Sequence, residues 1–123
     1  MFLPDIFCMN LKSFLFVLLV LLASNGAEAS SITSAETYYN LANDYYLRGE
    51  TQKSLENLEI FLKLRPGDAE ALYNFACLKL HTGKFVQAEE YFLKALKSSP
   101  SKALTPKIKE ALLWLKDLRI HSF

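Results

Sequence analysis

A direct repeat of 34 residues is the feature of this sequence that most constrains its fold. Residues 35–68 (AETYYNLANDYYLRGETQKSLENLEIFLKLRPGD) align without a gap to residues 69–102 (AEALYNFACLKLHTGKFVQAEEYFLKALKSSPSK). A unit of this length cannot bury an apolar face alone, so neighbouring units must stack and share one. The sequence therefore predicts a repeat fold. The identical pairs include Ala35/Ala69, Glu36/Glu70, Tyr39/Tyr73, Asn40/Asn74, Ala42/Ala76, Gly49/Gly83, Leu62/Leu96 and Pro66/Pro100.

Each unit is predicted to form two antiparallel helices. Apolar residues recur at helical spacing on both sides of a short turn centred on Gly49 in the first unit and Gly83 in the second. Glycine suits the left-handed conformation that commonly ends a helix, because it has no Cβ to clash there. Pro66 and Pro100 then stop the second helix of each unit, and Asp68 is a suitable N-cap for the helix that begins at Ala69.

The repeat resembles the tetratricopeptide repeat (TPR). That family has a small residue at position 8 of the unit, Gly or Ala near positions 15 and 20, an aromatic at 24, Ala at 27 and Pro at 32. The first unit departs from this pattern, with Ser54, Leu58 and Phe61 where Ala, an aromatic and Ala are usual, which predicts different packing there. The resemblance implies an all-α fold, a short right-handed superhelical α-solenoid. The second unit matches with Ala76, Gly83, Ala88, Phe92, Ala95 and Pro100.

A capping helix is predicted after the second unit, within residues 103–123. Thr105 followed by Pro106 predicts an N-cap and first turn, and the helix should run to about Ile120. Its apolar stripe should cover the last repeat, and Leu113 and Trp114 widen that stripe into either extra core or a contact surface. Two repeats and a cap make a thin array, which predicts marginal stability or self-association. The stripe comprises Ile108, Ala111, Leu112, Leu115 and Leu118.

Residues 1–29 are interpreted as a signal peptide. Lys12 precedes an apolar run from Phe14 to Ala23, which is too short to span a bilayer, and Ala27-Glu28-Ala29 supplies a small-residue cleavage site. Cleavage is placed after Ala29, with translation starting at Met1 or, for a cleaner leader, at Met9. The protein is therefore expected to be exported, periplasmic or secreted, without a stable membrane span after cleavage. Residues 30–34 form a short segment before the first unit.

The remaining chain has one cysteine and an uneven charge distribution. Cys8 lies in the leader, so Cys77 would be left without a partner for an internal disulfide. Residues 30–92 carry a net charge of −3 and residues 93–123 a net charge of +5. An anionic lipid or nucleic acid is one interpretation of the basic end, but a solubilising cap is preferred and no nucleic-acid partner is expected. The lysines concerned are Lys94, Lys97, Lys102, Lys107 and Lys109.

No catalytic function, metal or cofactor is expected. His81 and His121 are the two histidines, and neither has a nucleophile or an orienting group at a recognisable spacing. His81 ends a predicted helix, where an imidazole suits the negative end of the helix dipole.

The family resemblance implies that the concave face binds a protein or a peptide segment. We therefore expect a non-enzymatic adaptor or scaffold, in a bacterial envelope assembly. The chaperone-adaptor carboxylate clamp of this family is absent: Asn43 and Asn74 match it, but Tyr39, Leu104 and Ile108 stand where its cations should be. The peptide-binding residues carried over by repeat position are Glu36, Tyr39, Asn43, Tyr46, Tyr73, Asn74, Cys77, Leu80 and His81.

Two alternatives to the adaptor remain at this point. One is a structural protein that forms homo-oligomers through the open first repeat or through the Leu113/Trp114 surface. The other is a redox-responsive interaction module that uses the thiol of Cys77, for which a small, half-buried apolar residue is the plainer interpretation.

Overall fold

The computed structural model describes residues 34–121 and places five α-helices in them. The helices are α2 (Ala35–Leu47), α3 (Thr51–Leu64), α4 (Ala69–His81), α5 (Phe85–Lys97) and α6 (Leu104–His121). The described part contains no strand, so the all-α prediction is confirmed. The predicted leader, its start at Met1 or Met9 and its cleavage after Ala29 lie outside the described residues. The chain divides between Leu64 and Arg65 into two compact units.

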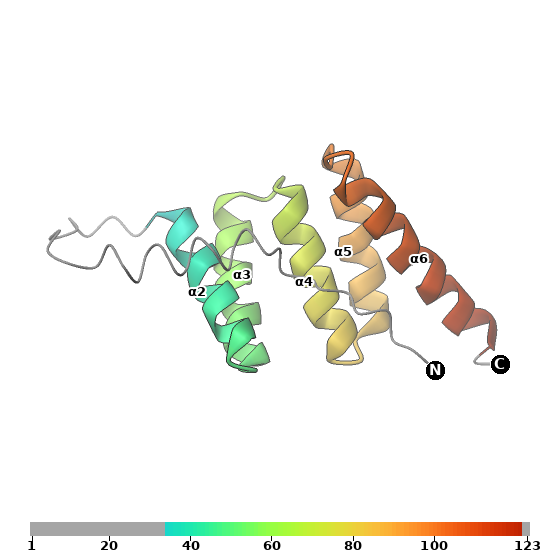
Figure 1. Cartoon of the computed structure of the whole chain (residues 1–123), viewed down its shortest axis with the longest axis horizontal. Coiled ribbons are helices and arrows are strands. Elements are labelled where there is room, and N and C mark those ends of the chain that lie inside the picture. Colours follow the sequence, from blue (N-terminus) through green and yellow to red (C-terminus); the bar gives the residue numbers. More distant parts are fainter. Residues whose placement is uncertain (1–33, 122–123) are drawn as a thin grey trace, which may run out of the picture. The chain divides into compact units, whose positions relative to one another are not determined.

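The first unit pairs α2 with α3 as an antiparallel helical hairpin (Figure 1). Gly49 forms the turn with a φ of 76°, the left-handed conformation that its sequence position predicts. The Gly49 amide donates to the Tyr46 carbonyl, and the Glu50 amide donates to the Tyr45 carbonyl. These bonds satisfy two carbonyls at the end of α2, as a glycine-terminated helix requires. The N-cap of α2 is Ser34, whose side chain makes no capping hydrogen bond.

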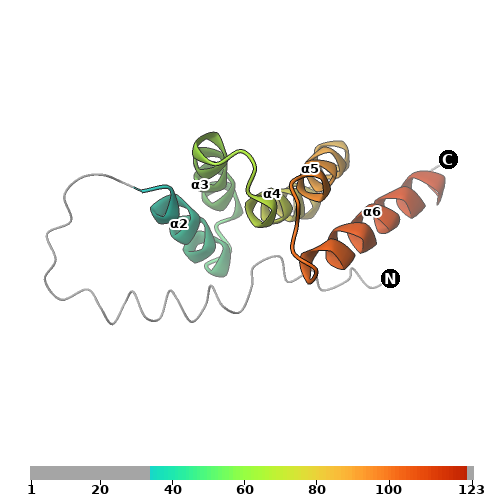
Figure 2. The same cartoon turned by 90° about the horizontal axis from the view of Figure 1, so that it is seen from above.

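The second unit repeats this hairpin with α4 and α5 and adds α6 against α5 (Figures 1 and 2). Gly83 adopts the same φ of 76° as Gly49. The Asp68 carboxylate accepts from the Ala71 amide at 2.9 Å, so the predicted N-cap is confirmed. Pro66 and Pro100 follow shortly after the ends of α3 and α5, as predicted.

The three residues of the first unit that depart from the family pattern still pack inside its hairpin. Ser54, Leu58 and Phe61 are all buried, as are Ala88, Phe92 and Ala95 at the equivalent positions of the second unit. The Ser54 hydroxyl donates to the Ala42 carbonyl at 2.7 Å, which satisfies its polar group inside the hairpin.

In each hairpin, a tyrosine of the first helix packs against a phenylalanine of the second helix, but the two phenylalanines stand at different positions of the repeat. Tyr39 lies 5.2 Å from Phe61 between ring centroids, and the equivalent Tyr73 lies 5.6 Å from Phe92. Phe61 and Phe92 occupy different repeat positions, so the ring has moved one helical turn along α3. Each hairpin nevertheless keeps its equivalent tyrosine against a phenylalanine, and the second hairpin adds Phe75 against Tyr91 at 4.6 Å between centroids.

The start of α6 differs from the prediction. The helix begins at Leu104, and the Thr105 hydroxyl donates to the Ser101 carbonyl instead of capping the helix. Ser101 takes the capping role, because its hydroxyl accepts from the Leu104 amide at 3.1 Å. Pro106 lies in the first turn of α6, as the sequence predicted.

The packed face of α6 follows the predicted stripe. Ile108, Ala111 and Leu115 are buried, whereas Leu112 and Leu118 are half-buried. Trp114 is half-buried, and its ring meets the ring of Phe85 in an edge-type contact at 6.3 Å between centroids. None of the described helices combines the length and the apolar character needed to span a membrane.

Candidate peptide-binding surface

The nine predicted binding residues lie on the first helix of each hairpin. Four are on α2 in the first unit and five are on α4 in the second unit. The α2 set is spaced at intervals of three or four residues, so it forms one stripe along the helix. The α4 set covers a wider strip, because Tyr73 and Asn74 are adjacent, as are Leu80 and His81. The α2 set is Glu36, Tyr39, Asn43 and Tyr46, and the α4 set is Tyr73, Asn74, Cys77, Leu80 and His81.

The α2 stripe combines exposed, half-buried and buried side chains. Glu36 is exposed, and Tyr39 and Tyr46 are half-buried. The ring of Tyr39 leans on Phe61 in the core of the hairpin, so one side of it is fixed by packing. Tyrosine offers a large contact area with few rotatable bonds, which suits a binding surface.

Asn43 is the unusual member of the α2 stripe. Its side chain is 2% exposed, and neither its Nδ2 nor its Oδ1 makes a hydrogen bond. Burying an amide without a partner costs on the order of 1–3 kcal/mol, so most buried side-chain amides are paired. Asn43 thus contributes no hydrogen bond from its side chain to the first unit.

The repeat supplies a direct comparison for Asn43. Cys77 stands at the equivalent position of the second unit and is completely buried. The small side chain of Cys77, whose thiol is only a weak donor, thus fits the position that Asn43 occupies in the first unit.

The α4 stripe is mostly enclosed in this structure. Tyr73, Asn74, Cys77 and Leu80 are each no more than 5% exposed. Tyr73 packs on Phe92, which explains part of its burial. The exposed member is His81, the last residue of α4, at the helix end where a positive charge is favoured.

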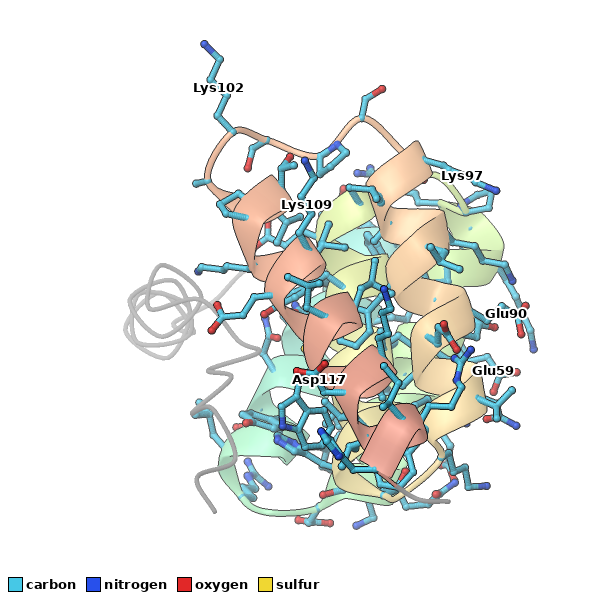
Figure 3. All side chains as sticks on the ribbon, turned by 90° about the vertical axis from the view of Figure 1, so that its right-hand side faces the viewer. Glu59, Glu90, Lys97, Lys102, Lys109 and Asp117 are labelled. Atoms are coloured by element: carbon cyan, nitrogen blue, oxygen red, sulfur yellow. The ribbon has the colours of Figure 1, made fainter. Side chains whose placement is uncertain are left out.

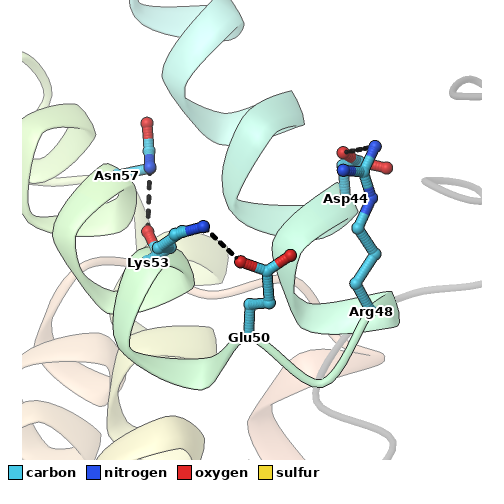
Figure 4. Close-up of polar contacts among 5 residues, drawn as sticks. All are labelled: Asp44, Arg48, Glu50, Lys53 and Asn57. Atoms are coloured by element: carbon cyan, nitrogen blue, oxygen red, sulfur yellow. Dashed lines mark hydrogen bonds and ion pairs between the residues drawn. The ribbon is translucent and has the colours of Figure 1, made fainter.

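The turn between α2 and α3 carries polar contacts that the sequence prediction did not include. Arg48 pairs with Asp44 at 2.7 Å, and Lys53 pairs with Glu50, while the Asn57 amide donates to the Lys53 carbonyl at 2.8 Å (Figure 4). The hydrogen bond from Lys53 to Glu50 raises the pKa of Lys53 above its ordinary value. These contacts join residues three or four apart, so helical spacing is the signal that would have found them.

No group of three histidine, cysteine or acidic side chains that would suit a metal ion occurs among residues 34–121.

A sequence model of the tetratricopeptide repeat family matches residues 69–102, the same range as the second repeat unit. The chain contains a tetratricopeptide repeat. Together with the helical hairpins, this match confirms the family resemblance predicted from the sequence. The first TPR-like unit lies outside the match, and its Ser54, Leu58 and Phe61 are the residues that depart from the family pattern. A search of curated proteins finds no match to the chain.

Proposed function

We propose that this TPR protein is an exported adaptor that binds a protein or peptide segment along the concave face of its repeats, within a bacterial envelope assembly. TPR units typically mediate protein interactions rather than catalysis. The observation that carries the proposal is Asn43, a predicted binding residue that is buried with both polar atoms unpaired.

A peptide backbone is the ligand that best suits a primary amide. The Nδ2 of Asn43 is a donor and its Oδ1 is an acceptor, and each peptide unit offers one acceptor and one donor in return. A partner segment that reaches Asn43 would thus remove the desolvation cost that the free protein carries. Tyr39 and Glu36 lie on the same stripe of α2 and would contact the side chains of that segment.

Affinity capture with two asparagine variants tests this proposal. The full chain, Asn43→Leu and Asn57→Leu are used to capture proteins from envelope extract, and the retained proteins are identified by mass spectrometry. Asn57 is the matched control, because its amide already donates to the Lys53 carbonyl within α3. We expect one partner to be retained by the parent and by Asn57→Leu and to be lost with Asn43→Leu.

The asparagine variant is a better probe than removal of the tyrosines. Tyr39 and Tyr73 pack on Phe61 and Phe92, so replacing them with alanine would also weaken the hairpins. Retention of the same partner by all three proteins would exclude Asn43 from binding and move the site elsewhere.

Export is part of the proposal and has its own test. The leader at residues 1–29 predicts a mature N-terminus at Ser30. N-terminal sequencing of protein recovered from the periplasm should therefore begin at Ser30. A chain recovered from the cytoplasm with its leader intact would rule out the exported adaptor.

The same capture experiment distinguishes the adaptor from the alternative, self-association. A homo-oligomer would retain tagged and untagged copies of this chain alone, and its mass in sedimentation would rise with concentration. The complete burial of Cys77 gives no support to a redox-responsive module, because a thiolate must be accessible to react.

A further inference from the structure

The outward side of α6 carries exposed aliphatic side chains, although a capping helix should present a polar face to water. Leu113 and Ile120 are 62% and 59% exposed. They are seven residues apart, so they lie in line along the helix, on the side away from its buried residues. The sequence suggested Trp114 as the neighbour of Leu113 in this surface, but the Trp114 ring packs against Phe85. Ile120 therefore takes that place.

Two rows of opposite charge flank this aliphatic line. At roughly 3.6 residues per turn, a basic row lies on one side of the line and an acidic row on the other. All four charged side chains are exposed. Figure 3 shows Lys109 on the first part of α6 and Asp117 farther along it. We define the α6 outer face as the basic row Lys109 and Lys116, the aliphatic Leu113 and Ile120, and the acidic row Glu110 and Asp117.

The charged side chains of the α6 outer face make no ion pair within residues 34–121. Neither lysine has an acidic residue three or four positions away, the spacing at which helical ion pairs form. Glu110 has Lys107 three positions away and still does not pair with it. Lys53, Lys63 and Lys94, in contrast, each pair with a glutamate at this spacing. The two rows are thus available to charges outside the chain.

We propose that the α6 outer face joins two copies of this protein, with their α6 helices running parallel. A twofold axis along the helices brings the same face of both copies together and exchanges its left and right sides. The basic row of each copy then lies against the acidic row of the other. An antiparallel pair would instead set each row against its own kind, and like charges would repel.

A second copy fits this face because the face is complementary to itself. A wholly anionic or wholly cationic partner would be repelled by one of the two rows, and an apolar partner would cover charges without pairing them. Leu113 and Ile120 of the two copies meet at the centre, where the lysine stems add apolar contact. The contact area is small, so we expect a dimer that dissociates on dilution.

Sedimentation velocity of the full chain over a range of concentrations tests this assignment. The mass should rise from one copy to two with concentration. Added salt should move this transition to higher concentration, because it screens the two charge rows. Residues 1–33 are present in every protein, so association through them would not respond to changes in α6.

Charge reversal identifies the two rows. One variant carries Lys109→Glu and Lys116→Glu, another carries Glu110→Lys and Asp117→Lys, and a third carries all four changes. Each of the first two should dimerise at least about tenfold more weakly, because attractive pairs become repulsive. The third variant should dimerise like the parent, and an equimolar mixture of the first two should form a mixed dimer.

Two further variants separate the face from net charge. Lys84→Glu with Lys102→Glu makes the same change in charge as the basic-row variant but lies outside α6, so it should keep the dimer. Leu113→Ser with Ile120→Ser should lose it, because the aliphatic centre is removed. Circular dichroism of each variant checks that it is folded.

Disulfide trapping measures the orientation of the two helices. With Cys8→Ser in place, Leu113→Cys should give a covalent dimer under mild oxidation, whereas Lys84→Cys should not. In an antiparallel pair centred between Leu113 and Ile120, the two copies of residue 113 would be about 10 Å apart along the helix. A disulfide spans at most roughly 7 Å between Cα atoms, so that pair would link Leu113→Cys to Ile120→Cys instead.

Several results would overturn the α6 dimer. A mass of one copy at every concentration would do so, as would full dimerisation by the basic-row variant or an equal loss in the charge-matched control. A failure of the mixed variants to associate would also contradict it. If a monomeric parent captures another protein that Leu113→Ser with Ile120→Ser loses, the face belongs to that protein. Peptide binding is proposed on α2, so these results do not depend on Asn43.

Discussion

Asn43 and Cys77 place different chemistry at equivalent positions of the two repeats. Both side chains are buried in equivalent places, but the amide has polar atoms that the hairpin does not satisfy. The thiol fits the same position at little cost. A residue that opposes stability without structural need is expected at a functional site.

Replacement of Asn43 by leucine should therefore stabilise the protein. Leucine has a similar branched shape and no polar atoms, so the variant avoids a desolvation cost of about 1–3 kcal/mol. Urea unfolding followed by circular dichroism should show a higher midpoint for Asn43→Leu. A clearly lower midpoint would mean that the amide is hydrogen-bonded in solution.

The pair of Lys53 and Glu50 predicts a dependence on pH at the turn between α2 and α3. The hydrogen bond that Lys53 donates to Glu50, and then the negative charge of Glu50, raises the pKa of Lys53 in the folded protein. A group with a raised folded pKa stabilises the fold below its unfolded pKa, and that contribution is lost as the pH rises through the folded pKa. The contribution of this pair is thus complete at neutral pH and disappears above the ordinary lysine range.

Titration of the Lys53 side chain by nuclear magnetic resonance checks this expectation. Glu50→Gln should lower the pKa of Lys53 toward its ordinary value, since it removes the charged acceptor. An unchanged pKa in this variant would show that the pair does not persist in solution.

The helical hairpin depends on a turn that glycine makes accessible. Gly49 and Gly83 have the same positive φ, and a Cβ added at either would meet no atom within 4 Å. Glycine is favoured there because of the positive φ, and not because a larger side chain would clash with its neighbours. This is why both turns follow directly from the repeated sequence.

Two glycine variants separate conformation from space. Gly83→Ala should destabilise the second unit by roughly 1–2 kcal/mol, the cost of a left-handed alanine. Gly67 also has open space around it but lacks a positive φ, so Gly67→Ala should be neutral or stabilising by about 0.4–1 kcal/mol. Thermal unfolding of both variants gives the comparison, and equal effects would contradict it.

At the scale of the whole molecule, the two units differ in the size of their cores. The first unit contributes four buried apolar residues from its described part: Ala42, Leu55, Leu58 and Phe61. The second contributes 14, including the three from α6. Among the residues that the structure describes, most of the buried apolar side chains thus belong to the second unit.

Hydrogen exchange should reveal this difference. Amides of α2 and α3 should exchange faster than those of α4 and α5, because local opening costs less where less apolar surface is buried. Mass spectrometry of peptides from the two units measures the two rates. Equal protection would show that the units open together.

The sequence alone determined the helical hairpins and their turns. A repeat of fixed length with glycine and proline at matching places leaves few alternatives, since these residues act through local backbone conformation. Asp68 was likewise predictable as an N-cap, because capping involves neighbours in the chain. The N-terminus of α6 was not, since Ser101 and Thr105 both have suitable hydroxyls and local geometry selects between them.

Tertiary structure decided burial and pairing. The burial of Asn43 without a hydrogen-bond partner depends on what packs around α2, which no spacing in the sequence specifies. The meeting of Tyr39 with Phe61 and of Tyr73 with Phe92 depends on how two helices face each other, so the moved ring could not be placed beforehand. The exposure of Leu113 beside a half-buried Trp114 has the same origin, because only the packing of α6 on α5 separates the covered side of that helix from its outer face.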